Sequence, residues 1–131
     1  CMVSDLEMLK QYVPKLPINI KKYIYDDRPT TVILSNPIAI ASNAIAKEKT
    51  VAIRIVNHHF CTPLISAFGK PLISTSANLS GHGHPKKYAD ISEEIISGVD
   101  YIIKQDIDKV NDKASRIIKL EKTGKTTLIR A

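Results

Sequence analysis

The feature that most limits the fold of this chain is the alternation of short apolar segments with capped helical segments. The β-branched or apolar runs predict strands at 30–34, 51–56, 72–75, 101–103, 115–120 and 126–130. Capping residues, prolines and glycines predict helices at about 4–13, 17–25, 39–46, 63–68 and 90–98. Such interleaving is typical of the α/β class with a mixed sheet. The 131 residues show no repeat or linker, so we expect a single domain over 1–131.

One predicted strand contains a charged residue among apolar ones. The segment Val51–Val56 is apolar on both faces except at Arg54. A guanidinium in such a strand must find a partner or reach the end of the strand. Two interpretations stay open: an ion pair with an aspartate or glutamate inside the protein, or a fork that binds the carboxylate or phosphate of a ligand.

The positive charge of the chain is concentrated toward its carboxyl end. The net charge is +6, and residues 104–131 carry eight basic and four acidic side chains, while 1–30 and 31–103 are each at +1. A positive field favours phosphate-bearing partners such as a nucleotide or an RNA, although a solvated surface is the alternative. The segment Lys122–Thr126 is similar to part of a phosphate loop, but Lys119 stands where that loop needs a glycine. Its place between two strands predicts a hairpin turn.

The cysteine and histidine content favours a cytoplasmic protein without a bound metal. The two cysteines lie far apart, and we find neither a secretory leader nor an apolar run long enough to span a membrane. The histidines at 58, 59, 82 and 84, even with Cys61, form no strong zinc pattern, so we interpret them as loop residues. No nucleophilic triad or carboxylate pair stands out, and we assign no catalytic residue. Chemistry in this chain would depend on positioning and charge.

A hydroxyl-rich segment follows the third predicted strand and carries a family resemblance. Pro71–Gly81 reads PLISTSANLSG, and its second part resembles the Ser-Thr-Ser-Ala-Asn-x-Ser-Gly signature of the YrdC-like threonylcarbamoyl-adenylate synthase family. Further segments that resemble family strands follow in the family's order: 28–34, 51–55, 114–118 and 128–130. The resemblance covers 1–131 and implies a YrdC/RibB-like twisted mixed sheet flanked by helices.

The resemblance implies a nucleotidyltransferase. L-threonine, bicarbonate and ATP would give threonylcarbamoyl-adenylate and pyrophosphate, and other proteins would move the threonylcarbamoyl group to an adenosine in tRNA. ATP is then a substrate, Mg²⁺ would be carried by its phosphates, and tRNA or tRNA-modification proteins are potential partners. No membrane partner is implied.

The resemblance also implies the site residues, position by position. The implied ATP contacts are Thr31, Ser76, Arg130 and His84, the last at the place of a family serine. The implied threonine contacts are Arg54, Ser74 and Ser115. Short hydroxyls at the end of a strand can surround phosphate oxygens without crowding them, and an arginine can bind a carboxylate with two parallel hydrogen bonds.

One family feature has no counterpart in this sequence. Nothing in residues 1–30 matches the Lys-x-Arg and Lys-Pro segments that bind nucleotide in the family, so the resemblance implies a chain that lacks the amino-terminal part. Two alternatives therefore stay open. The chain could be a non-catalytic YrdC-like module that binds tRNA or a nucleotide, or the YrdC-like domain of a carbamoyltransferase.

Overall fold

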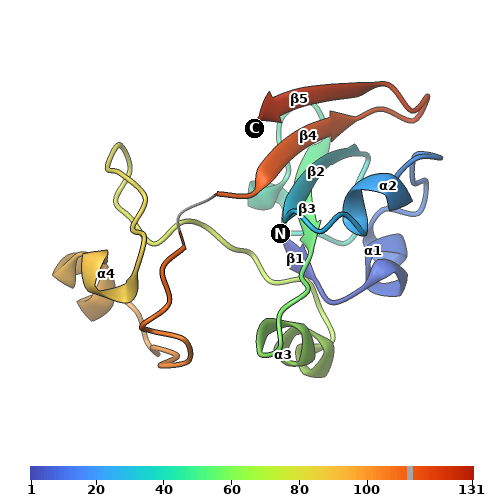
Figure 1. Ribbon diagram of the computed structural model, residues 1–131. Coiled ribbons are helices and arrows are strands. Elements are labelled where there is room, and N and C mark those ends of the chain that lie inside the picture. The colour runs from blue at the N-terminus through green and yellow to red at the C-terminus, as the bar shows by residue number, and fades with distance from the viewer. Residues whose placement is uncertain (112–113) are drawn as a thin grey trace. The chain divides into compact units, whose positions relative to one another are not determined.

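The computed structural model describes residues 1–111 and 114–131 and divides them into two compact units. The first unit consists of Cys1–Ser74 and Ser115–Ala131, and the second of Thr75–Ala114. Figure 1 shows the helices and strands of each unit. That residues 1–131 form one family domain stays a prediction.

The first unit is built on a five-stranded mixed sheet. Its strands are β1 (Met2–Val3), β2 (Thr30–Ser35), β3 (Thr50–Ile55), β4 (Arg116–Leu120) and β5 (Thr126–Arg130). They lie in the order β1-β3-β2-β4-β5, as Figure 1 shows. The pairs β1–β3 and β2–β4 are parallel, and the pairs β2–β3 and β4–β5 are antiparallel. The predicted α/β class with a mixed sheet is confirmed.

One face of this sheet carries the hydrophobic core. Every second residue of β2, including Val32 and Leu34, is buried, because successive side chains of a strand point to opposite faces. The helices of this unit are α1 (Leu6–Tyr12), α2 (Lys21–Ile24) and α3 (Cys61–Phe68), with a 3₁₀ turn, η1, at Ser42–Ala44. Helix α1 starts at Asp5, whose carboxylate accepts a hydrogen bond of 2.8 Å from the Met8 N–H. Helix α3 ends at Gly69, which adopts the left-handed conformation with φ 72°.

The second unit contains little regular structure. It holds the 3₁₀ turn η2 (Tyr88–Asp90) and the helix α4 (Glu93–Ser97), which begins after Ser92 and ends at Gly98, close to the predicted bounds. Within the described residues, none of the fully buried core side chains belongs to this unit.

Two predicted strands are wrong. In the segment 72–75, only Leu72 pairs, through a bridge to Met2 with hydrogen bonds of 2.8 and 3.0 Å. The segment 101–103 forms no strand, and Tyr101 is 82% exposed. Both segments are apolar enough to suggest a strand, but a strand also needs a neighbour to complete its ladder of hydrogen bonds. The helix predicted at 17–25 is shorter, at Lys21–Ile24, because a turn between Pro17 and Ile20 precedes it.

None of the helices in the described part of the chain has the length and apolar character needed to cross a lipid bilayer.

Candidate active site

The parallel pairing of β2 and β4 brings two of the predicted site hydroxyls together. The register pairs Thr30 with Arg116, so Thr31 near the start of β2 lies close to Ser115, which directly precedes β4. The two hydroxyl oxygens, Thr31 Oγ1 and Ser115 Oγ, are 3.1 Å apart and share a hydrogen bond. Both side chains are half-buried. Residues that are 84 positions apart in the sequence therefore form one polar pair.

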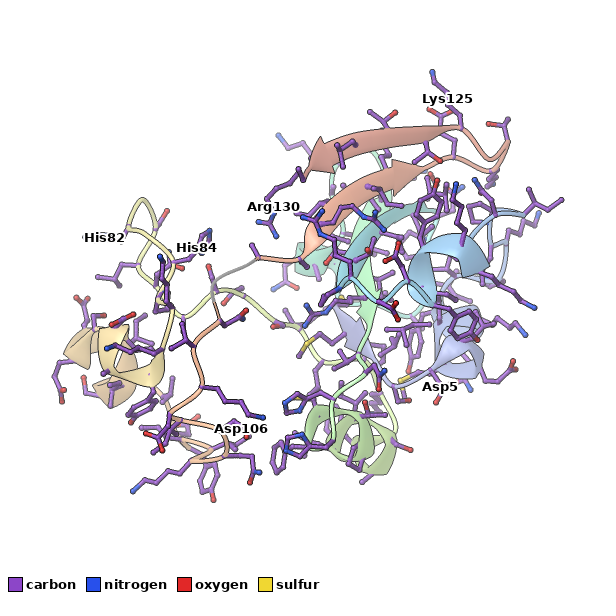
Figure 2. The ribbon with its side chains drawn as sticks, viewed as in Figure 1. Asp5, His82, His84, Asp106, Lys125 and Arg130 are labelled. Atoms are coloured by element: carbon purple, nitrogen blue, oxygen red, sulfur yellow. The ribbon has the colours of Figure 1, made fainter. Side chains whose placement is uncertain are left out.

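The antiparallel return of β5 adds Arg130 to this pair. Arg130 pairs with Ile117, next to the start of β4, and Figure 2 shows it at that end of β5. Its Nε and Nη2 donate to the Ser115 carbonyl oxygen at 3.0 and 2.7 Å, and Nη2 also lies 3.4 Å from Ser115 Oγ. These bonds fix the guanidinium beside the two hydroxyls. Because Arg130 is exposed, its charge is accessible to an anion. We call Thr31, Ser115 and Arg130 the hydroxyl–arginine cluster.

Arg54 lies on the same face of the sheet as this cluster. Val32 and Ile53 are paired and both belong to the buried core, so Thr31 and Arg54, each one position away, point to the opposite face. We call this second surface of the sheet, which carries Thr31 and Arg54, the site face. The register of β2 and β3, extended by one residue, sets Thr31 opposite Arg54.

The surroundings of Arg54 favour one of its two interpretations. The side chain is half-buried, and its Nη2 lies 3.7 Å from the sulfur of Met2, a weak acceptor. Within residues 1–111 and 114–131, no carboxylate oxygen lies within 4.0 Å of its guanidinium nitrogens. The described structure thus gives Arg54 no internal ion pair. A guanidinium in this position can bind the carboxylate of a ligand.

A third arginine, Arg116, supports the cluster from the other face of β4. Arg116 donates from Nη2 to Asp26 Oδ2 at 2.8 Å and to Thr30 Oγ1 at 2.9 Å, while its Nε lies 3.2 Å from the same Thr30 oxygen. Its guanidinium carbon lies 5.9 Å from the centre of the Tyr23 ring. We call this arrangement of Arg116, Asp26 and Thr30 the Arg116 clamp. It joins the starts of β2 and β4 next to the hydroxyl pair.

The Arg116 clamp also changes the acidity of its carboxylate. The backbone N–H of Arg28 and, after it, the side chain of Arg116 hold the pKa of Asp26 below its ordinary value. Sequence reasoning missed this clamp. Opposite charges at 26 and 116 are the only signal in the sequence, and pairing over 90 positions depends on the register of β2 and β4.

Ser74, Ser76 and His84, the remaining predicted site residues, are all exposed. Ser74 is exposed and lies two residues beyond the bridge between Leu72 and Met2. Ser76 and His84 are exposed residues of the second unit. Their predicted contacts with threonine and ATP stay predictions.

The signature segment has a defined local shape within the second unit. The side-chain amide nitrogen of Asn78, Nδ2, donates to the carbonyl oxygens of Leu79 and His82 at 2.9 and 3.1 Å. The His82 N–H donates to the Leu79 carbonyl at 3.0 Å, and Gly81 adopts a left-handed conformation with φ 83°. Asn78 and Gly81 thus shape the turn, and the hydroxyl groups are left at the surface.

The predicted hairpin turn between β4 and β5 is confirmed. The Glu121 N–H donates to the Lys125 carbonyl at 2.9 Å, and the Gly124 N–H donates to the Glu121 carbonyl at 2.9 Å. Gly124 has a φ of 90°, which a residue with an L side chain rarely adopts.

Among the histidines, His58 uses Nδ1 as an acceptor for the N–H groups of Phe60 and Cys61 at 3.2 and 3.3 Å, at the start of α3.

Comparison with known proteins gives a family match over the whole chain and relatives that match 71% to 78% of it. The Sua5/YciO/YrdC family model, described as "Telomere recombination", matches residues 1–131. Threonylcarbamoyl-AMP synthase of Pseudoalteromonas translucida is 28% identical over 106 residues, which are 78% of this chain and 57% of that protein. The Buchnera aphidicola protein of the same name is 31% identical over 97 residues, 71% of this chain and 52% of that protein. The Bacillus subtilis protein of the same name is 30% identical over 93 residues, which are 71% of this chain and 27% of that protein.

The chain therefore spans about half the length of the first two of these relatives and 27% of the length of the third. Among solved structures, the crystal structure of E. coli YciO matches 98% of this chain and 63% of that chain, with a TM-score of 0.78 at 24% identity. At this identity, the match shows the fold alone. The five-stranded mixed sheet with its flanking helices is the fold of that protein.

Proposed function

Because the chain belongs to the Sua5/YciO/YrdC family, we propose that it acts in the synthesis of L-threonylcarbamoyladenylate. Its substrates would be L-threonine, bicarbonate and ATP, and its second product pyrophosphate. Relatives at 28% to 31% identity carry the name threonylcarbamoyl-AMP synthase. The observation that carries the proposal is the gathering of Thr31, Arg54 and Arg130 on one face of the sheet.

The proposal gives Arg54 and Ser115 to threonine. A guanidinium binds a carboxylate with two parallel hydrogen bonds, and Arg54 is a half-buried arginine to which the described residues offer only the weak acceptor of Met2. Ser115 Oγ, 3.1 Å from Thr31 Oγ1, can donate to a second oxygen of the amino acid. Ser74, from the signature segment, would add another hydroxyl.

The proposal gives Thr31 and Arg130 to ATP. Arg130 is exposed and is held by its bonds of 2.7 and 3.0 Å to the Ser115 carbonyl, so its charge is fixed beside the hydroxyl pair. A fixed guanidinium can offset the charge of a polyphosphate without reorganising during the reaction. Ser76 and His84 of the second unit would add contacts to the nucleotide.

The reaction suits a site that positions groups and neutralises charge. The threonine amine condenses with bicarbonate to a carbamate, with loss of water. A carbamate oxygen then attacks the α-phosphorus of ATP, and the bond from that phosphorus to the bridging oxygen breaks as pyrophosphate leaves. Arg54 would hold the amino acid while Arg130 stabilises the charge on the phosphates. The side chains of the hydroxyl–arginine cluster contain no carboxylate, which fits a Mg²⁺ ion that is carried by the phosphates and supplies further charge neutralisation.

The direct experiment measures pyrophosphate release by the protein with ATP, threonine and bicarbonate. Release that depends on threonine supports the proposal, and its absence contradicts it. Arg54→Ala should raise the KM for threonine much more than the KM for ATP, and Lys47→Ala, which removes an exposed charge of the same unit, should change neither. An equal rise in the KM for threonine and in the KM for ATP in Arg54→Ala would contradict the role of Arg54.

A second candidate function uses the same site without turnover. Arg130 is exposed and held by its bonds to the Ser115 carbonyl, so it can bind a phosphate whether or not turnover follows, which favours considering a module that binds a nucleotide or tRNA without catalysis. Saturable ATP binding that needs Arg130, together with no threonine-dependent pyrophosphate release, would support this candidate. ATP and tRNA, the ligands of these candidates, occur in the cytoplasm, and we propose that the chain acts there.

A further inference from the structure

Met2 lies beside Arg54 on the site face of the sheet. The register of the parallel pair β1–β3 sets Met2 opposite Arg54, so the two side chains point to the same face (Figure 1). On its other side, Met2 is bridged to Leu72. The site face therefore carries a row of side chains across the sheet, from Leu72 through Met2 and Arg54 to Thr31.

The sulfur of Met2 is the acceptor that the structure offers to the Arg54 guanidinium. Met2 Sδ lies 3.7 Å from Arg54 Nη2, and within the described residues no carboxylate lies within 4.0 Å of this guanidinium. A thioether sulfur is a weak acceptor, so the contact leaves Arg54 available for the carboxylate of a ligand. The strength of the acceptor at position 2 thus decides how available Arg54 is.

Oxidation of Met2 to the sulfoxide converts this weak acceptor into a strong one. A lone pair of the sulfur attacks hydrogen peroxide, the S–O bond forms, the O–O bond breaks and water leaves, so the sulfur is oxidised and the peroxide is reduced. The product carries a polar oxygen on the sulfur. Because Met2 Sδ is 3.7 Å from Arg54 Nη2, that oxygen can come within hydrogen-bonding distance of the nitrogen.

The two methionines of the chain differ in their access to an oxidant. Met2 is half-buried, whereas Met8 is 8% exposed and belongs to the hydrophobic core. Oxidation of methionine follows exposure, so Met2 should react before Met8. Met8 therefore serves as an internal reference.

We propose that Met2 is a redox-sensitive modification site, whose sulfoxide binds Arg54 and withdraws it from the carboxylate of the amino-acid substrate. This inference rests on the proposed function, in which Arg54 holds threonine. Since that proposal gives Thr31 and Arg130 to ATP, oxidation affects threonine much more than the nucleotide. A thiol-dependent reductase, which removes the oxygen as water while its thiols form a disulfide, restores the thioether and the site.

The first test follows Arg54 itself and needs no substrate. The protein is treated with hydrogen peroxide and then with dithiothreitol, which reduces oxidised cysteines, and its peptides are identified by mass. Met2 should gain one oxygen before Met8 does. Phenylglyoxal, which modifies guanidinium groups, should then react with Arg54 at least about threefold more slowly than in the untreated protein, and with the exposed Arg28 at an unchanged rate.

The second test measures pyrophosphate release before and after peroxide. Oxidation should raise the KM for threonine at least about threefold, leave the KM for ATP nearly unchanged, and be reversed by methionine sulfoxide reductase. Met2→Gln, whose amide oxygen is a stronger acceptor than sulfur, should raise the KM for threonine without peroxide. In Met2→Leu, which has no sulfur at this position, peroxide should leave the KM for threonine where it was. Urea midpoints show that each variant is folded.

Three results would overturn the proposal. They are an unchanged phenylglyoxal rate at Arg54 after oxidation of Met2, oxidation of Met8 before Met2, and an equal rise in the KM for threonine when Met2→Leu is treated with peroxide. Each of them is compatible with threonine-dependent release by the untreated protein. Absence of that release contradicts the proposed function instead, and the phenylglyoxal rates still decide whether the sulfoxide binds Arg54.

Discussion

The Arg116 clamp makes a quantitative prediction about stability, because its acceptor is a buried hydroxyl. Thr30 is 5% exposed, donates to the Arg28 carbonyl at 2.9 Å, and accepts from Arg116 at 2.9 and 3.2 Å. Thr30→Val keeps the shape of the side chain and removes all three bonds. It leaves two guanidinium nitrogens of Arg116, Nε and Nη2, and the Arg28 carbonyl with one partner fewer each.

The expected cost follows from the kinds of bond that are lost. The bond to the carbonyl contributes roughly 1 kcal/mol, and a bond to a charged group contributes more when it is buried. Since the Arg116 side chain is 21% exposed, water can replace part of that bond, and we expect a total loss of about 2 kcal/mol in Thr30→Val. Arg116→Met should cost a similar amount. The double variant should cost about 1 kcal/mol less than the sum, because both changes remove the same bonds.

Urea unfolding followed by circular dichroism at neutral pH measures these free energies. The matched control is Thr50→Val, because Thr50 is also a buried threonine, 5% exposed, at the first position of a strand. Within the described residues, no side-chain hydrogen bond of Thr50 is formed, so its loss should be below about 0.5 kcal/mol. Two results would refute the reasoning. One is an equal loss of unfolding free energy in Thr30→Val and Thr50→Val, and the other is a double variant of Thr30 and Arg116 whose loss equals the sum of the two single losses.

Three further changes test other parts of the structure. Ile53→Ala, at a fully buried position of β3, should lower the free energy of unfolding by about 2 to 5 kcal/mol in the same urea assay, whereas Ile38→Ala, at a position 50% exposed, should cost far less. Asp5→Ala removes the cap of α1 and should cost about 1 kcal/mol at pH 7. Because the Met8 N–H lowers the pKa of Asp5 from 3.8, its contribution should be present above that value and lost as the pH falls through the lower pKa of the folded state, which urea midpoints measured against pH will show. Gly124→Ala, at φ 90°, should cost about 1 kcal/mol, and an unchanged midpoint would contradict the turn geometry.

The sequence was most informative where structure is local. The strands at 30–35, 50–55, 116–120 and 126–130 follow from runs of β-branched and apolar residues, and the turn at Gly124 follows from its glycine. The segments 72–75 and 101–103 also look like strands, but the first pairs only at Leu72 and the second forms no strand, and pairing cannot be read from a short window. Strand propensity alone therefore overpredicts the sheet.

The candidate site was also predictable only in part, because its residues could be named from the sequence but their contacts could not. Residues of the hydroxyl–arginine cluster were expected to bind two different substrates on the strength of a family resemblance. Only the structure shows that Thr31 and Arg130 both contact Ser115. The Arg116 clamp depends on a contact over 90 positions. Charge counts along the sequence placed the positive field at the carboxyl end. They could not show that Asn19 and Tyr23 are hydrogen-bonded to Gly124 and Thr126 of the β4–β5 hairpin, over 105 and 103 positions.

The measurement that tests the central claim most directly is isolation of the product formed from isotope-labelled bicarbonate. The protein is incubated with ATP, threonine and labelled bicarbonate, and the nucleotides are separated and identified by mass. The account predicts a labelled threonylcarbamoyl-adenylate that forms only when all three substrates are present and that is strongly reduced in Arg54→Ala and Arg130→Ala. Conversion of ATP without threonine, or no labelled adenylate with all three substrates present, would contradict it.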